Sequence, residues 1–152
     1  MGSGYHPLMA LLASYAALFA LSFVAATAVP MSSEPPLILL VRSGEGIILP
    51  VFVATVGNVL GACTTYLLGR GAIRVYKRKK PLRILRGQER ARRLLARYGQ
   101  PALALSWVPI LGDALVALAG VTGVRFVPFL FWVALGKGAR YLVIALAALN
   151  LF

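Results

Sequence analysis

Long uncharged stretches dominate the pattern of polar and apolar positions along this chain. No Asp, Glu, Lys or Arg occurs in residues 7–33 or in residues 46–69. A helix rises about 1.5 Å per residue, so each stretch is long enough to cross a hydrocarbon core of about 30 Å. The chain is also 60% hydrophobic with a mean hydropathy of +0.83, outside the range of soluble domains. We therefore predict an all-α integral membrane protein.

The first uncharged stretch resembles a secretory signal in position only. It has neither a basic flank nor an obvious cleavage site, so we interpret it as mature membrane sequence. Two forms remain open for residues 7–29, because the periodicity does not separate them. They form either a full span, or an interfacial helix followed by the first arm of a hairpin.

Positive charge is concentrated in the middle of the chain. All but four of the sixteen Lys and Arg residues lie between Arg70 and Arg97, and Glu89 is the only acid among them. Loops rich in Lys and Arg stay on the cytoplasmic side of a membrane. We therefore predict that the basic loop 70–98 is cytoplasmic, in a multi-pass protein of a bacterial or archaeal plasma membrane.

The second half of this loop has apolar residues at helical spacing. Ala91, Leu94, Leu95 and Tyr98 alternate with arginines, which predicts a basic amphipathic helix lying on an anionic leaflet. A net charge of +12 would also suit a nucleic-acid partner. The basic residues flank apolar spans instead of forming a domain of their own, so we expect no nucleic-acid binding.

The two halves on either side of the loop resemble each other. A shift of 79 residues aligns unusual positions in the same order: Pro30 with Pro109, Glu34 with Asp113, Ser43-Gly44 with Thr122-Gly123, Phe52 with Phe131 and Gly57 with Gly136. Apolar segments align easily by chance. The matched carboxylates carry more weight, because the chain has only four acids. We interpret the halves as an internal repeat.

Each half is predicted to contain a broken, re-entrant hairpin followed by a transmembrane helix. The segment from each carboxylate to the following glycine turn is about ten residues, or roughly 15 Å of helix, which is half a bilayer. Proline and glycine interrupt the chain before it, at Pro30, Pro109 and Gly112. Such a break must be buried in protein or line a wet cavity.

The predicted layout is a single membrane domain, residues 1–152, with two inverted halves. Residues 5–69 hold a hairpin near 30–44 that opens outward and a span over 46–69. Residues 99–152 hold a hairpin near 109–123 that opens inward and a span over 126–150. Inverted repeats of this kind bring broken helices together at the midplane of many transporters.

Four charged residues are the main candidates for function. Glu34 and Asp113 fall at the hairpin tips, while Lys137 and Arg140 share one face half-way along the last span. Ionisable groups at this depth mark functional sites by default. Either acid is a candidate proton carrier, and Arg140 is a candidate contact for a lipid phosphate. The alternative is that the four charges hold the two halves together without a further role.

Supporting residues are assigned less specifically. Asn58 could hydrogen-bond to a hairpin, Tyr141 could contact a head group, and Pro109 and Gly112 shape the second break. Gly57 and Gly61 form a Gly-x-x-x-Gly face for helix packing. Cys63 is the only cysteine and His6 the only histidine, so we expect no metal site and no cofactor. No hydrolase triad or phosphate-binding loop motif occurs, and we expect no enzyme.

Several motifs together resemble one family. "GNVLGACTTYLLGR" from Gly57, "SWVPILGDALVALAG" from Ser106, "FLFWVALGKGARYL" from Phe129 and "SSEPPL" around Glu34 are similar to the DedA family. This is also called the VTT or SNARE-associated Golgi family, and the likeness is to its short, YqaA-like branch. It covers roughly residues 15–149. It implies two oppositely oriented re-entrant hairpins.

The resemblance also implies a function. The family moves phospholipids or polyprenyl phosphates, notably undecaprenyl phosphate, between leaflets, and the proton motive force has been proposed to take part. Typical members carry two arginines in the second hairpin where this chain has Ser106 and Gly112. We expect a lipid transporter of flippase or scramblase type. A proton-coupled transporter of a small solute and a non-transporting, membrane-organising protein are the alternatives, and a homodimer could complete the path.

Overall fold

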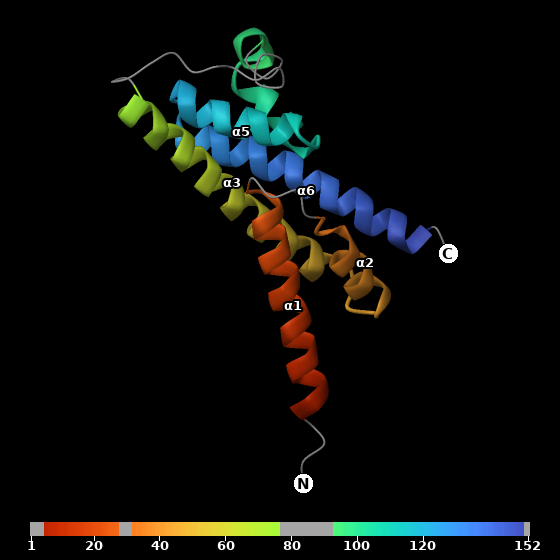
Figure 1. The fold of residues 1–152 in the computed structure, drawn as a ribbon. Helices are drawn as coiled ribbons and strands as arrows, with labels where there is room; N and C mark the ends of the chain where they lie inside the picture. The colour runs from red at the N-terminus through yellow and green to blue at the C-terminus, as the bar shows by residue number, and fades with distance from the viewer. Residues whose placement is uncertain (1–4, 28–31, 77–92, 151–152) are drawn as a thin grey trace.

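The structure, a computed structural model, describes residues 5–27, 32–76 and 93–150, and all regular structure in these ranges is helical (Figure 1). Residues 93–98 form a short helix. The other elements are α1 (Tyr5–Ala25), α2 (Glu34–Arg42), α3 (Ile48–Tyr76), the 3₁₀ helix η1 (Gln100–Trp107), α5 (Leu111–Thr122) and α6 (Phe126–Asn150). Residues 1–4, 28–31, 77–92 and 151–152 lie outside the description.

Three of these helices are long and apolar enough to cross a membrane. The candidate spans are Leu8–Ala25, Ile48–Gly71 and Phe126–Asn150. The chain is therefore an all-α integral membrane protein, as its composition predicts. Residues 5–25 form one uninterrupted helix, without the division into an interfacial helix and a separate hairpin arm.

The two long central helices begin in the same way. Pro50 and Pro128 each occupy the third position of their helix, α3 and α6. Proline is tolerated in a first turn because the amide hydrogens there have no partner inside the helix. α6 starts and ends at the residues that we expect for the second span. α3 continues seven residues past Gly69 into the basic segment, through Gly71 and without meeting a proline.

The helical structure is interrupted between α1 and α2. Pro35 and Pro36 follow Glu34 in the first turn of α2, where their fixed backbone angle favours helix initiation. α2 has nine residues, or roughly 13 Å, so it reaches through less than half of a bilayer. Pro30, predicted to interrupt the chain here, lies outside the described residues.

The second break lies between η1 and α5. Ile110 has a φ of 66°, a conformation that costs a β-branched residue energy and that is rare outside turns and strained sites. Gly112 follows it, and a Cβ atom there would meet the carbonyl oxygen of Ser106. α5 then runs for twelve residues and ends at Gly123 in the left-handed conformation. The arm before the break is a 3₁₀ helix of eight residues, much shorter than α1.

The halves are arranged in opposite directions. α3 and α6 run antiparallel, and the pair α1–α2 extends from its break toward one end of the molecule, while η1–α5 extends toward the other (Figure 1). α1 packs along α3 and η1 along α6. The short helix of each half packs against the other half: α5 packs on α3 of the first half, and α2 packs on α6 of the second half. Each half therefore completes the packing of the other.

Glycines permit these close approaches. A Cβ atom at Gly57 would lie 2.6 Å from the carbonyl oxygen of Phe19, and one at Gly61 would meet that of Phe23. The predicted Gly-x-x-x-Gly face is therefore the contact between α3 and α1. Gly120 of α5 meets the backbone of Tyr66 in the same way. Small residues are how membrane helices bring their backbones together.

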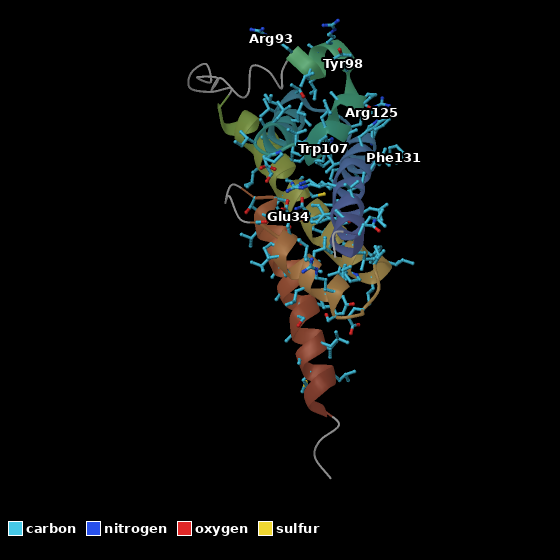
Figure 2. The ribbon with its side chains drawn as sticks, turned by 90° about the vertical axis from the view of Figure 1, so that its right-hand side faces the viewer. Glu34, Arg93, Tyr98, Trp107, Arg125 and Phe131 are labelled. Carbon is cyan, nitrogen blue, oxygen red and sulfur yellow. The ribbon has the colours of Figure 1, made fainter. Side chains whose placement is uncertain are left out.

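Basic residues gather at one end of the molecule. Arg93, Tyr98 and Arg125 lie there, far along the bundle from Glu34 (Figure 2). Leu94 and Leu95 are half-buried and pack against the protein core, so this part of the predicted amphipathic helix turns its apolar residues toward the protein. Arg93 and Arg97 are exposed. The remainder of that helix, with Ala91, lies outside the described residues.

Candidate functional site

A polar cavity of about 650 Å³ lies where the two helix breaks meet. Its lining includes all four charged candidates from the sequence, Glu34, Asp113, Lys137 and Arg140. They come from three elements, α2, α5 and α6. Two formal negative and two formal positive charges share this cavity, so the charges of its ionised lining balance. Its volume is in the range of small-molecule sites, about 300–1,000 Å³.

The cavity lies at the middle of the membrane-spanning helices. Asn58 is about ten residues, or roughly 15 Å, from the start of α3, and Lys137 is at a similar distance from the start of α6. The candidate spans end at Gly71 and Asn150, each thirteen residues or roughly 20 Å further on, so Asn58 and Lys137 both lie near the middle of a span. Figure 2 shows Glu34 between the two ends of the molecule.

Both carboxylates lie in the first turn of a helix. Glu34 opens α2, and Asp113 is the third residue of α5. The free amide groups and the dipole of a helix favour negative charge at this end. The repeat therefore places an acid wherever a short helix starts at the cavity, which gives a local physical reason for a carboxylate inside an apolar segment.

A chain of hydrogen bonds runs across the cavity wall. Lys137 Nζ, on a residue only 5% exposed, donates to Asn58 Oδ1. Asn58 Nδ2 donates to the Tyr141 hydroxyl at 2.7 Å, and that hydroxyl lies 2.6 Å from Ser33 Oγ. Because the Tyr141 oxygen accepts from Asn58, its own proton is free to bond Ser33. The chain joins α6 to α3 and then to the start of α2.

The Glu34 carboxylate and the Arg140 guanidinium form an ion pair between α2 and α6. Arg140 also donates to the carbonyl oxygen of Trp107 at 3.4 Å. The two charged side chains are 39% and 33% exposed, so neither is sealed from the cavity. This arginine thus connects α2, α6 and the end of η1.

Asp113 differs from Glu34 in its contacts. Its carboxylate makes no hydrogen bond or ion pair with another of the described residues, although it is half-buried and lines the cavity beside Lys137 and Arg140. Of the two repeat-related acids, one is paired and the other is left to face the cavity.

The structure adds polar residues that the sequence analysis did not assign to the site. Ser33 enters the hydrogen-bond chain, and Thr27 and Ser106 line the cavity. The Ser106 hydroxyl is buried and has no hydrogen-bond partner among the described residues. The shift of 79 residues could have indicated Thr27 and Ser106, because it pairs the two. The same shift pairs Asn58 with Lys137, which bond directly to each other.

The other candidates lie elsewhere or support the backbone. Pro109 lines the cavity, and Gly112 allows the close turn against Ser106. Three further charged residues that were not candidates, Arg42, Glu45 and Arg125, are exposed. Cys63 is half-buried and free. Among the described residues, no three His, Cys, Asp or Glu side chains come together as metal ligands.

The hydrogen-bond chain gives a first test. Replacing Tyr141 by phenylalanine removes one hydroxyl and leaves the Asn58 amide and the Ser33 hydroxyl without that partner. Leaving a buried polar group unpaired costs about 1–3 kcal/mol, so we expect a lower unfolding temperature in detergent micelles. Tyr98→Phe, which removes an exposed hydroxyl, is the matched control. Equal unfolding temperatures for the two variants would contradict this assignment.

Comparison with known proteins supports a single family. The VTT domain matches residues 5–149. Inner membrane protein YqaA of Escherichia coli (strain K12) is 42% identical over 137 residues, 88% of this chain and 89% of that protein. The protein of the same name from Shigella flexneri matches equally.

A more distant relative extends the comparison. An uncharacterized protein of Haemophilus influenzae is 35% identical over 135 residues, which are 84% of this chain and 82% of its own length. No solved structure matches. The match over nearly the whole chain confirms the resemblance found in the sequence motifs. The chain belongs to the VTT-domain, or DedA, family of membrane proteins.

Proposed function

We propose that this protein moves lipids between the two leaflets of a bacterial plasma membrane, as a flippase or scramblase and without enzymatic chemistry. The observation that carries the proposal is the charge-balanced polar cavity at mid-depth in an otherwise apolar helical bundle. A lipid head group that crosses a bilayer loses its hydration in the hydrocarbon, and an unpaired polar or charged group is costly there. The cavity offers such a group carboxylates, cations and hydroxyls at the depth where this cost is greatest.

The two helix breaks fit this role as tips of re-entrant hairpins. α2 and α5 are each too short to cross the bilayer, and both start at the cavity. Hairpins that enter from opposite faces would give the cavity one approach from each leaflet, as in inverted-repeat transporters. The concentration of basic residues at the α5 end supports a cytoplasmic location for that end.

The substrate in this proposal is a phosphate-bearing lipid, either a polyprenyl phosphate such as undecaprenyl phosphate or a phospholipid. Arg140 is the proposed phosphate contact, because its guanidinium is partly exposed and borders the cavity. Ser106 and Gly112 stand where typical family members carry arginines, so Arg140 and Lys137 supply the cations here. The basic loop is proposed to bind the anionic leaflet, and a second copy of the chain is a proposed partner.

One observation favours a second candidate function, proton-coupled transport of a small solute. Asp113 faces the cavity without a hydrogen-bond partner among the described residues, close to a hydrogen-bond chain that ends at Lys137. Such a carboxylate is suited to bind and release a proton. Solute-driven proton flux in vesicles, with no exchange of lipids, would select this candidate over the first.

The decisive experiment reconstitutes the purified protein into vesicles with labelled polyprenyl phosphate or labelled phospholipid. We expect the wild type to exchange at least one of these lipids between leaflets, and Glu34→Gln and Asp113→Asn to exchange it more slowly. Leaflet exchange equal to that of protein-free vesicles for every lipid would overturn the proposal.

A double variant separates function from mere stabilisation. Asp113→Asn combined with Lys137→Met removes one charge of each sign, so the cavity stays balanced. If these residues act on the lipid, the folded double variant should be inactive. A double variant that folds and transports as well as the wild type would assign the two residues a structural role only.

A further inference from the structure

A second pocket lies next to the polar cavity and is almost entirely apolar. Its volume is about 420 Å³, and its lining consists of residues from the end of η1, the second break and α6: Trp107, Pro109, Gly136, Ala139, Arg140, Val143 and Ile144. Arg140 is the only ionisable side chain in this lining. By chemistry alone, the pocket suits hydrocarbon.

The two spaces adjoin. Pro109 and Arg140 belong to the lining of both. The stem of Arg140 can cover apolar surface while its charged head remains in a polar environment, which is common for this side chain. Its guanidinium is fixed between the Glu34 carboxylate and the carbonyl oxygen of Trp107. Arg140 therefore stands at the boundary between a polar and an apolar compartment.

We propose that the apolar pocket is the binding site for a hydrocarbon chain of the same lipid whose head group enters the polar cavity. The inference rests on the proposed function and adds a second subsite: the phosphate of the lipid lies near Arg140, and its hydrocarbon chain lies against Trp107 and α6. A water-soluble solute has no hydrocarbon chain that could occupy the apolar pocket.

The shape of the pocket supports a specific site over ordinary contact with bulk lipid. A Cβ atom at Gly136 would meet the carbonyl oxygen of Ala104, so the backbones of α6 and η1 are in contact here and close one wall of the pocket. The side chains of Trp107 and Val143, 48% and 64% exposed, stand beside it. Ala139 is exposed and small, which leaves room in front of Arg140.

A matched pair of variants tests the pocket. Ala139→Phe places a ring in it, whereas Ala147→Phe places the same ring two turns further along α6, at an exposed position outside this lining. Neither change removes a charge from the polar cavity. We expect Ala139→Phe to slow leaflet exchange of a long-chain lipid at least tenfold, and Ala147→Phe to leave it within twofold.

A second experiment measures lipid binding to the pocket and does not depend on transport. Trp132→Phe leaves Trp107 as the only tryptophan, so its fluorescence reports on the pocket. Titrating in phosphatidylglycerol with brominated acyl chains should quench Trp107 in a saturable way, at mole fractions too low for random contact. Ala139→Phe in this background should abolish the saturable part, and Ala147→Phe should keep it.

The outcomes are distinguishable. Quenching that rises only in proportion to the brominated lipid, and equally in both alanine variants, would overturn the chain site even if the wild type transports lipid. Saturable quenching that Ala139→Phe removes would support the chain site even if vesicles show no leaflet exchange, in which case only the proposed transport fails. An unchanged unfolding temperature for both variants ensures that the comparison is between folded proteins.

Discussion

Gly120→Ala should unfold at a clearly lower temperature than the wild type, although alanine is the better helix former. A Cβ atom at this position would meet the carbonyl oxygen of Tyr66 and lie 3.0 Å from its carbonyl carbon and 3.1 Å from the amide nitrogen of Arg70. All three are backbone atoms of α3, so no side-chain rotation relieves the contact. Either α5 and α3 separate or the local backbone deforms.

The expected cost follows from the magnitudes of the two opposing effects. Overpacking a close-packed interior costs about 1–3 kcal/mol, while exchanging a helical glycine for alanine gains roughly 1 kcal/mol of helix propensity. Backbone contacts this short put the packing cost at the upper end of its range, above the gain in helix propensity. The substitution should therefore lower the free energy of unfolding. Unfolding in detergent micelles, followed by circular dichroism, measures it.

Gly71→Ala is the matched control for this substitution. Gly71 also lies in a helix, but apart from its chain neighbours and its own helix backbone no atom of the described residues comes within 4 Å of the position where its Cβ would be. This variant should be as stable as the wild type or slightly more so. If Gly120→Ala and Gly71→Ala shifted the unfolding temperature alike, the close contact between α5 and α3 would be refuted.

Substitutions at the ion pair between Glu34 and Arg140 should affect stability and transport differently. Arg140→Gln is expected to slow lipid exchange by roughly ten- to a hundredfold, because a charge-assisted hydrogen bond contributes about 1.5–3 kcal/mol and about 1.4 kcal/mol corresponds to a factor of ten in rate. Its effect on stability should be smaller. Both side chains of the pair are more than 30% exposed, and exposed pairs contribute about 0–1 kcal/mol.

The double exchange Glu34→Arg with Arg140→Glu provides the contrast. It keeps one charge of each sign between α2 and α6, so the unfolding temperature should return close to that of the wild type. Transport should not return, because the cation then lies on α2 and no longer adjoins the apolar pocket that Arg140 borders. Recovery of both properties would show that the pair serves only to hold the halves together. Leaflet exchange and unfolding temperature are measured on the same preparations.

Local sequence properties were sufficient to predict several of the helical segments. α6 coincides with the largely apolar segment after Arg125, whose only charged residues are Lys137 and Arg140, and α2 and α5 begin where proline, glycine and a carboxylate interrupt apolar sequence. These features act within a few residues through helix length, missing amide hydrogens and turn preference. The end of α3 was predicted less well, because charge marks the membrane boundary while helix formation continues beyond it.

The internal repeat allowed part of the site to be predicted as well. The shift of 79 residues relates Glu34 to Asp113, and both acids line the cavity. It could also have indicated that Asn58 and Lys137 are equivalent. It could not reveal that they bond to each other, since that contact depends on how closely α3 and α6 approach.

The sequence by itself determined a membrane protein of two related halves with charges at matched breaks, because hydropathy and chain interruption are local properties. Tertiary structure alone decided which charges are paired. Glu34 and Arg140 meet, Asp113 faces the cavity, and the Ser106 hydroxyl is buried without a partner among the described residues. It also placed an apolar pocket against Arg140. These relations join residues up to 106 positions apart, and they arise only when glycine contacts bring the helices into register.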